Sequence, residues 1–135
     1  MRRRALLVLP LLTGLCAALA AAPAAAPAPD ARAAQHLRGE TLYLLACAMC
    51  HGDRLEGTPG GPALSGEGFE AGFGTLPPRA LHDLIRDLMP EGARGTLTPQ
   101  EVLDVTAYLL AENSFVLPQE ALGAAELDQL LRRTP

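Results

Sequence analysis

The pentapeptide Cys47-Ala48-Met49-Cys50-His51 is the part of this 135-residue sequence that decides its fold. Two cysteines three positions apart in a helical turn present their thiols to the same side. Both thiols can therefore add to the two vinyl groups on one edge of a porphyrin. The adjacent imidazole of His51 then lies under the ring, where it can bind iron. Because C-x-x-C-H is the attachment pattern of c-type haem, the sequence predicts one covalent haem c at Cys47, Cys50 and His51.

Other kinds of site can also use two closely spaced cysteines. A thioredoxin-like redox pair expects a βαβ context, which this sequence does not suggest. A zinc site needs further ligands, and it would have to recruit His36 or His82. A plain disulfide between Cys47 and Cys50 leaves His51 without a role. Covalent haem is the interpretation that uses the whole motif.

A haem that carries electrons is usually held on both faces, and His paired with Met raises its potential. Met1 belongs to the predicted N-terminal signal peptide, and Met49 lies between the two cysteines on the side of the proximal histidine. Met89 is the remaining methionine. Pro90 forces it into an extended conformation at the end of a predicted helix, so that its sulfur can reach the iron. We therefore expect Met89 to be the distal ligand. His82 is the alternative candidate for this role, but we expect it to lie on the surface.

The N-terminus has the pattern of an export signal. Three arginines at 2–4 precede an apolar run over 5–20, and Ala18-Leu19-Ala20 provides a cleavage site. The run is shorter than the roughly 20 residues that span a bilayer, although a retained anchor is the alternative. Cys16 is preceded by Leu15, which disfavours lipid attachment. We expect a signal peptide over 1–20, a periplasmic location and no stable membrane span after cleavage.

The charge of the exported protein limits its partners. Removing residues 1–20 removes three arginines and no acid, which changes the formal net charge from −4 to −7. The chain contains no lysine. Nucleic-acid binding needs cationic groups that displace counterions from phosphates, so an acidic protein of this kind is not expected to bind nucleic acid. Partners with basic docking patches are favoured instead.

The first half of the mature chain contains one predicted helix and a long loop. Residues 21–34 are almost entirely alanine and proline, which predicts a flexible leader. Apolar residues and good helix formers predict a first helix over 35–48. Residues 52–78 are rich in glycine and proline, which argues against a long regular element there. A loop of this length in a small domain needs a body to wrap around.

The second half has clearer helical signals. A helix is predicted over 78–88 from apolar residues at i, i+3, i+4 and i+7, namely Leu81, Leu84, Ile85 and Leu88. Thr98-Pro99-Gln100-Glu101 predicts the start of another helix, which runs to about Glu112. The tail 118–135 contains leucines among acids and could form a short packing helix. No strand pattern of useful length is present.

With these features, residues 36–117 resemble the class I monohaem cytochrome c family. Gly39 and Tyr43 lie where the family has a glycine and an aromatic on its first helix, and Tyr108 resembles the aromatic of its last helix, which implies a close crossing of these helices at Gly39. The segment after the motif is similar to the family's haem-wrapping loop at His51-Gly52, Leu55, Gly57, Gly61-Pro62, Leu64, Gly66 and Phe69. The resemblance implies that Pro62 and Leu64 contact the haem and that the Pro62 carbonyl accepts a hydrogen bond from His51. This chain has Phe73 at a position near the haem where relatives often have a tryptophan.

This resemblance implies a small all-α cytochrome c fold, with three to four helices around one haem, over residues 35–117. Leu88-Met89-Pro90, the following turn and the capped last helix are similar to short cytochrome domains that serve quinoprotein alcohol dehydrogenases and periplasmic sulfur-compound dehydrogenases. The expected function is a periplasmic electron carrier that cycles between Fe(III) and Fe(II). Its expected partners are redox proteins such as a periplasmic dehydrogenase, an oxidase or another cytochrome. The alternatives are a haem subunit of a dehydrogenase complex, attached through the tail, and an open-site haem enzyme or sensor.

Overall fold

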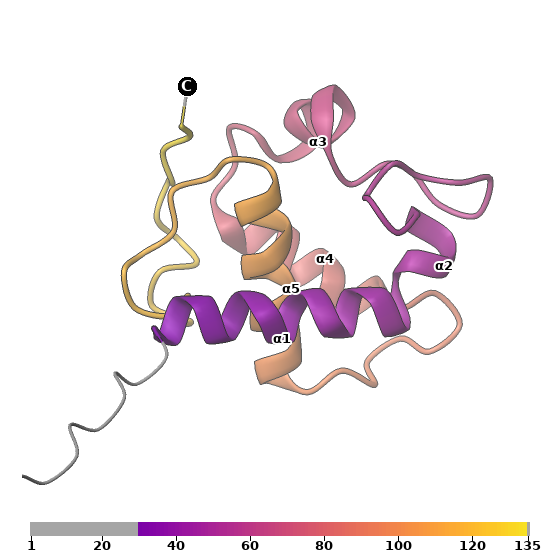
Figure 1. Cartoon of the computed structure of the whole chain (residues 1–135), viewed down its shortest axis with the longest axis horizontal. Helices are drawn as coiled ribbons and strands as arrows, with labels where there is room; N and C mark the ends of the chain where they lie inside the picture. The colour runs from indigo at the N-terminus through magenta and orange to yellow at the C-terminus, as the bar shows by residue number, and fades with distance from the viewer. Residues whose placement is uncertain (1–29, 135) are drawn as a thin grey trace, which may run out of the picture.

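The computed structural model describes residues 30–134, and there the chain forms five helices joined by loops (Figure 1). The helices are α1 (Ala31–Ala46), α2 (Ala48–His51), α3 (Gly66–Phe73), α4 (Pro78–Leu88) and α5 (Pro99–Glu112). The expected all-α class is confirmed. The predicted signal peptide and most of the predicted leader lie outside the described residues. Within residues 30–134, no helix combines the length and hydropathy needed to cross a membrane.

Helices α1 and α5 cross at Gly39, as the resemblance implied (Figure 1). A Cβ atom at this position would overlap the Asp104 carbonyl oxygen and lie 2.7 Å from the Tyr108 Cβ. Glycine is therefore required for the two backbones to approach this closely. Arg38 strengthens the crossing, because its guanidinium donates to both carboxylate oxygens of Asp104, at 2.7 and 2.9 Å.

The first helix begins at Ala31, earlier than the predicted start at residue 35. Asp30 is its N-cap, and the Asp30 side chain accepts a hydrogen bond from the Arg32 backbone N–H at 3.0 Å. A capped run of alanines is a good helix even where the overall composition suggests a flexible leader. The structure therefore assigns residues 31–34 to the helical domain. The loop 52–78 also contains a short helix, α3, although no long element interrupts it.

Helices α4 and α5 have the bounds that the sequence predicted. The Thr98 hydroxyl accepts from the Glu101 backbone N–H at 3.3 Å, and the Glu101 carboxylate accepts from the Thr98 backbone N–H at 2.7 Å. This capping box and the proline at 99 fix the first turn of α5. Almost the whole of α5 from Val102 to Leu110 is buried, so this helix forms the centre of the core.

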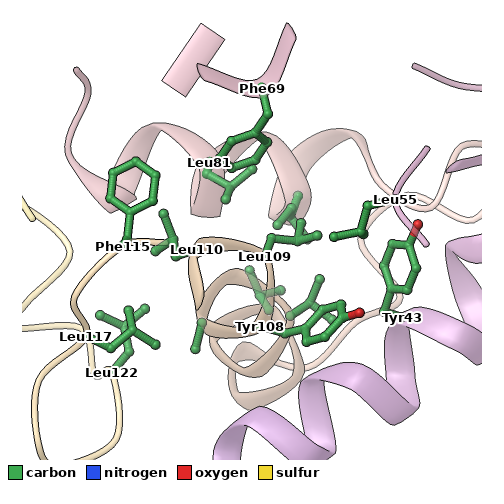
Figure 2. Close-up of a cluster of buried hydrophobic side chains, with 14 of the residues drawn as sticks. Tyr43, Leu55, Phe69, Leu81, Tyr108, Leu109, Leu110, Phe115, Leu117 and Leu122 are labelled. Carbon is green, nitrogen blue, oxygen red and sulfur yellow. The ribbon is translucent and has the colours of Figure 1, made fainter. Parts of the chain in front are cut away.

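The core lies between α5, α1, α4 and the segment after α5 (Figure 2). Phe69 and Leu81 lie over one side of α5, while Leu117 and Leu122, from the segment after α5, lie on another side of it (Figure 2). The tail forms turns instead of the short helix considered from the sequence, but it packs firmly: Leu122 and Leu127 are each 1 % exposed. Leu122 and Leu127 thus belong to the core of the domain.

Candidate haem-binding site

A cleft lies where α2, the following loop, the segment after α4 and one side of α5 meet. Its empty volume, including the open mouth, is about 820 Å³. The cleft is lined by every site residue that the sequence predicted, namely Cys47, Cys50, His51, Pro62, Leu64 and Met89.

The two cysteines enter the cleft from the junction of α1 and α2. Cys47 ends α1 and precedes α2, and Cys50 lies within α2, so one helical turn separates them. Both are free thiols and partly buried. Burial raises the pKa of the Cys47 thiol to about 11, and the neighbouring Cys50 adds to the shift. Cys47 is therefore protonated at neutral pH in the haem-free chain.

His51 is held in one orientation at the end of α2. The residue is 7 % exposed, and its Nδ1 lies 2.7 Å from the Pro62 carbonyl oxygen. A carbonyl oxygen only accepts, so Nδ1 carries the hydrogen and donates it. In the neutral ring, Nε2 then has a free lone pair, which is the form that binds a metal.

A glycine at 61 permits this arrangement. A Cβ at Gly61 would lie 2.8 Å from the Cys50 carbonyl oxygen and 3.0 Å from the His51 Cε1 atom. The loop backbone therefore packs directly against the imidazole ring. Gly61 was recognised in the sequence as part of the family's loop, and its steric role here is to let the loop reach His51.

Tyr43 fixes the backbone that follows His51. Its side chain is fully buried, and its hydroxyl donates to the Gly52 carbonyl oxygen at 2.5 Å. Burial raises the pKa of Tyr43 far above its ordinary value of 10.0, so the hydroxyl keeps its proton. Tyr43 also packs against Tyr108, with ring centroids 5.5 Å apart. The sequence identified both aromatics but not this hydrogen bond.

Met89 lies directly after α4 in the extended conformation that Pro90 was expected to impose, with φ −118° and ψ 153°. It is partly buried and lines the same cleft as His51. His82, its rival as a ligand, does not line the cleft. The expectation of a surface position for His82 was wrong, because its side chain is only 12 % exposed and its Nδ1 lies 2.9 Å from Asp83 Oδ1.

The remaining histidine also lies outside the cleft. His36 Nε2 is 3.0 Å from Glu112 Oε1, next to the end of α5. Within residues 30–134, no group of three or more His, Cys, Asp and Glu side chains is placed to hold a metal ion. The zinc interpretation would need His36 or His82 beside the two cysteines, and the structure places neither of them there.

Asn113 is a buried residue near the cleft that the sequence did not reveal. Its Nδ2 donates to the Leu64 carbonyl oxygen at 2.9 Å and to the Leu109 carbonyl oxygen at 2.8 Å. Leu64 and Leu109 both line the cleft. Asn113 thus ties the loop to the end of α5. An asparagine at the end of a helix looks like an ordinary C-cap, so no local signal indicates this longer-range contact.

The donor set and lining fit a haem c. Two thiols one turn apart, an imidazole with a free Nε2 and a thioether sulfur all line one cleft. Most of the other lining side chains are apolar, namely Ala46, Ile85, Leu97, Val105 and Leu109. The ionisable side chains beyond the ligand candidates are Tyr43 and Glu91. Such a lining suits a large flat apolar ring with a polar edge at the mouth.

The chain is similar to known proteins in sequence and in fold. The chain is 33 % identical over 89 residues to thiosulfate dehydrogenase from Stutzerimonas stutzeri (strain A1501), a match that covers 62 % of this chain and 28 % of that protein. The sulfane dehydrogenase SoxCD from Paracoccus pantotrophus superposes with a TM-score of 0.55 at 27 % identity, over 70 % of this chain and 51 % of the SoxCD chain. The chain therefore spans about a quarter to a half of the length of these relatives.

The profile of one protein family matches residues 34–109. The matched segment runs from α1 to the buried part of α5, and it includes all the predicted ligands. Haem c is the cofactor of this family. The chain belongs to the family of cytochrome c domains described as cytochrome C oxidase, cbb3-type, subunit III.

Proposed function

We propose that this chain is a one-electron carrier that holds a single haem c through Cys47 and Cys50. The observation that carries the proposal is the meeting of both thiols, the His51 imidazole and the Met89 sulfur in one largely apolar cleft. We assign catalytic chemistry to none of these side chains. The haem, when bound, supplies a single iron that exchanges one electron between its ferric and ferrous states.

His51 is the proposed proximal ligand. Its Nε2 is available because Nδ1 donates to the Pro62 carbonyl oxygen. A hydrogen bond from the second ring nitrogen also fixes the ring plane and makes the ligating nitrogen more basic. Gly61 keeps the loop in contact with the ring. The contacts with Pro62 and Gly61 thus set the orientation of the proposed ligand.

Met89 is the proposed distal ligand. Its backbone N–H donates to the Ile85 carbonyl oxygen at 3.1 Å, so the last turn of α4 fixes where the side chain starts. A thioether ligand paired with an imidazole would favour the reduced state of a bound haem and raise its potential. The buried apolar residues Ile85, Val105 and Leu109 line the same cleft. An apolar lining favours the less charged state, so these residues shift the potential in the same direction as Met89.

A direct test uses protein exported from a host with haem-attachment machinery. We expect its intact mass to include one haem that survives denaturation. Reduction by ascorbate should add one electron per protein, and reoxidation should pass one electron to hexacyanoferrate(III). Replacing both cysteines, Cys47→Ala and Cys50→Ala, should abolish covalent attachment. A protein without haem, or with haem that denaturation releases from the wild type, contradicts the proposal.

The distal ligand is tested by a matched pair of variants. Met89→Ala should let carbon monoxide bind the ferrous protein rapidly, because it opens one face of the iron. His82→Ala should leave carbon monoxide binding as slow as in the wild type, because His82 does not line the cleft. Rapid binding to the wild type would instead support an open-site enzyme or sensor.

We further propose that residues 1–20 direct export to the periplasm and that the carrier accepts electrons there from a dehydrogenase. The support comes from the relatives, whose names describe dehydrogenases and of which this domain spans only 28 % and 51 %. In those proteins the matching segment is one part of a larger molecule. Co-purification of a dehydrogenase with the tagged protein from its periplasm would support this role, and recovery of the free domain alone would contradict it.

A further inference from the structure

The outward side of α1 carries a row of exposed residues that the fold does not use. Leu37, Thr41 and Leu45 follow one another at intervals of four, and Met49 continues this interval into α2. Residues at this spacing form a ridge along a helix. Leu37 is 63 % exposed, Leu45 81 % and Met49 90 %. We call Leu37, Thr41, Leu45 and Met49 the α1 ridge.

No other helix of the described chain covers the α1 ridge. Helix α1 packs on α5 and α2, and it does so through the opposite side, where Gly39 and Tyr43 are buried (Figure 1). A shallow groove runs beside the ridge and is lined by Leu37, Arg38, Thr41, Leu42, Leu45, Glu101 and Asp104. A ridge with an adjoining groove is the shape that a packing partner needs.

The border of the ridge is acidic. Asp104 and Glu101 lie along the groove together with one cation, Arg38, which is already paired with Asp104. Glu40 follows Leu37 by three positions on α1, which places it at the other side of the ridge. Three carboxylates against one guanidinium leave a surplus of two negative charges. A partner with lysine or arginine around an apolar centre complements this border.

Met49 follows Leu45 by four positions, beyond the end of α1, and it lines the haem cleft, so the ridge ends near the cleft. A protein seated on the ridge therefore lies next to the mouth of the cleft. A second copy of this chain is disfavoured as the occupant, because a symmetric pair would bring two acidic borders together.

We propose that the α1 ridge docks a basic redox protein that exchanges electrons with this domain at the Met49 end. This rests on the proposed function as an electron carrier. The apolar residues of the ridge supply contact area, and the acidic border guides the partner and sets its orientation. In the exchange, one electron leaves the reduced domain and reduces the oxidised partner.

The test measures stopped-flow electron exchange between the reduced holoprotein and a lysine-rich mitochondrial cytochrome c, used as a basic redox probe. The variant Leu37→Ser/Leu45→Ser should lower the second-order rate constant about tenfold, because it removes the apolar contact. Leu130→Ser is the matched control, since Leu130 is 72 % exposed but lies in the tail. We expect its rate constant to stay within about twofold of wild type.

The acidic border is tested by the salt dependence of the same reaction. Glu40→Gln should weaken the fall of the rate constant with ionic strength, because screening acts on the charges that guide the encounter. Glu120→Gln, an exposed acid in the tail, should leave the salt dependence as in the wild type.

Hexacyanoferrate(III), which needs no protein docking surface, separates this proposal from the proposed function. If the wild type fails to reduce it, the carrier function itself fails. If hexacyanoferrate(III) is reduced normally but Leu37→Ser/Leu45→Ser behaves like Leu130→Ser toward the protein probe, the docking proposal is overturned. A wild type that sediments as a dimer and becomes a monomer in the double variant would assign the ridge to a second copy and overturn it as well.

Discussion

Gln35 connects the beginning of the domain to its tail, and its removal gives a sharp test of the fold. The side chain is fully buried in α1. Its Nε2 donates to the Leu122 carbonyl oxygen at 3.0 Å, and its Oε1 accepts from the Leu122 backbone N–H at 2.6 Å. Leu122 is itself 1 % exposed, so water cannot replace the amide. We expect Gln35→Met, which keeps the approximate size but removes both hydrogen bonds, to release the tail.

The expected magnitude follows from the two backbone groups left without partners. Each buried donor or acceptor that loses its hydrogen bond costs about 1–3 kcal/mol. The free energy of unfolding should therefore fall by about 3 kcal/mol, in the lower half of the combined range of about 2–6 kcal/mol. In a domain of this size each kcal/mol lowers the melting temperature by roughly 4–8 °C, so the variant should melt more than about 10 °C below the wild type.

The assay is guanidinium unfolding of the holoprotein, followed by circular dichroism. Gln129→Met is the matched control, because the Gln129 side chain is exposed and makes only a 3.4 Å contact with the Ala125 carbonyl oxygen. Its free energy of unfolding should change by less than about 0.5 kcal/mol. If Gln35→Met also stays within that limit, the paired hydrogen bonds to Leu122 do not hold the tail and the reasoning is refuted.

Three further outcomes can be measured on the same protein. Gly39→Ala should lower the free energy of unfolding by about 2 kcal/mol, because the new methyl group overlaps the Asp104 carbonyl oxygen. The control Gly72→Ala places a methyl group where no atom lies within 4 Å, so it should leave the free energy of unfolding unchanged or raise it. Equal effects of the two substitutions would contradict the close crossing of α1 and α5. Hydrogen bonds from Thr98 lower the pKa of Glu101 below its ordinary value of 4.5, so this carboxylate contributes to the free energy of unfolding above pH 4.5 and loses that contribution as the pH falls through the lowered pKa. In an acid titration, the free energy of unfolding of Glu101→Gln should therefore fall less steeply than that of the wild type. An unchanged slope would count against the capping box. In the haem-free protein, the rate at which iodoacetamide alkylates Cys47, measured by mass spectrometry, should rise with pH and reach half of its maximum near pH 11, the raised pKa of the thiol. A midpoint at the ordinary pKa of 9.0 would show that burial does not hold the thiol protonated.

The parts of the fold that the sequence predicts well are those with local causes. Helix α5 begins at Thr98 because the capping box and the proline occupy adjacent positions, and α4 is recognised because its apolar residues recur at helical spacing. The motif at 47–51 likewise places both thiols and the imidazole by spacing alone. The position of Met89 in the cleft could be anticipated because few methionines remain and Pro90 fixes the backbone.

What the sequence does not reveal depends on contacts between distant residues. A buried glutamine such as Gln35 looks like a surface residue until Leu122 is placed beside it. Asn113 looks like a helix cap until the Leu64 carbonyl oxygen is within reach. The early start of α1 was missed because the composition of the leader hides Asp30 as an N-cap. The partial burial of His82 also depends on neighbours that its helix alone does not specify.

The central claim is that this domain holds one haem c between His51 and Met89. Absorption spectra of the exported protein, oxidised and then reduced, test it most directly, and they should include the far-red sulfur-to-iron charge-transfer band of the oxidised form. We predict a c-type spectrum with this band in the wild type and its loss in Met89→Ala. A c-type spectrum without the band would contradict the role of Met89, and the absence of any haem spectrum would contradict the account as a whole.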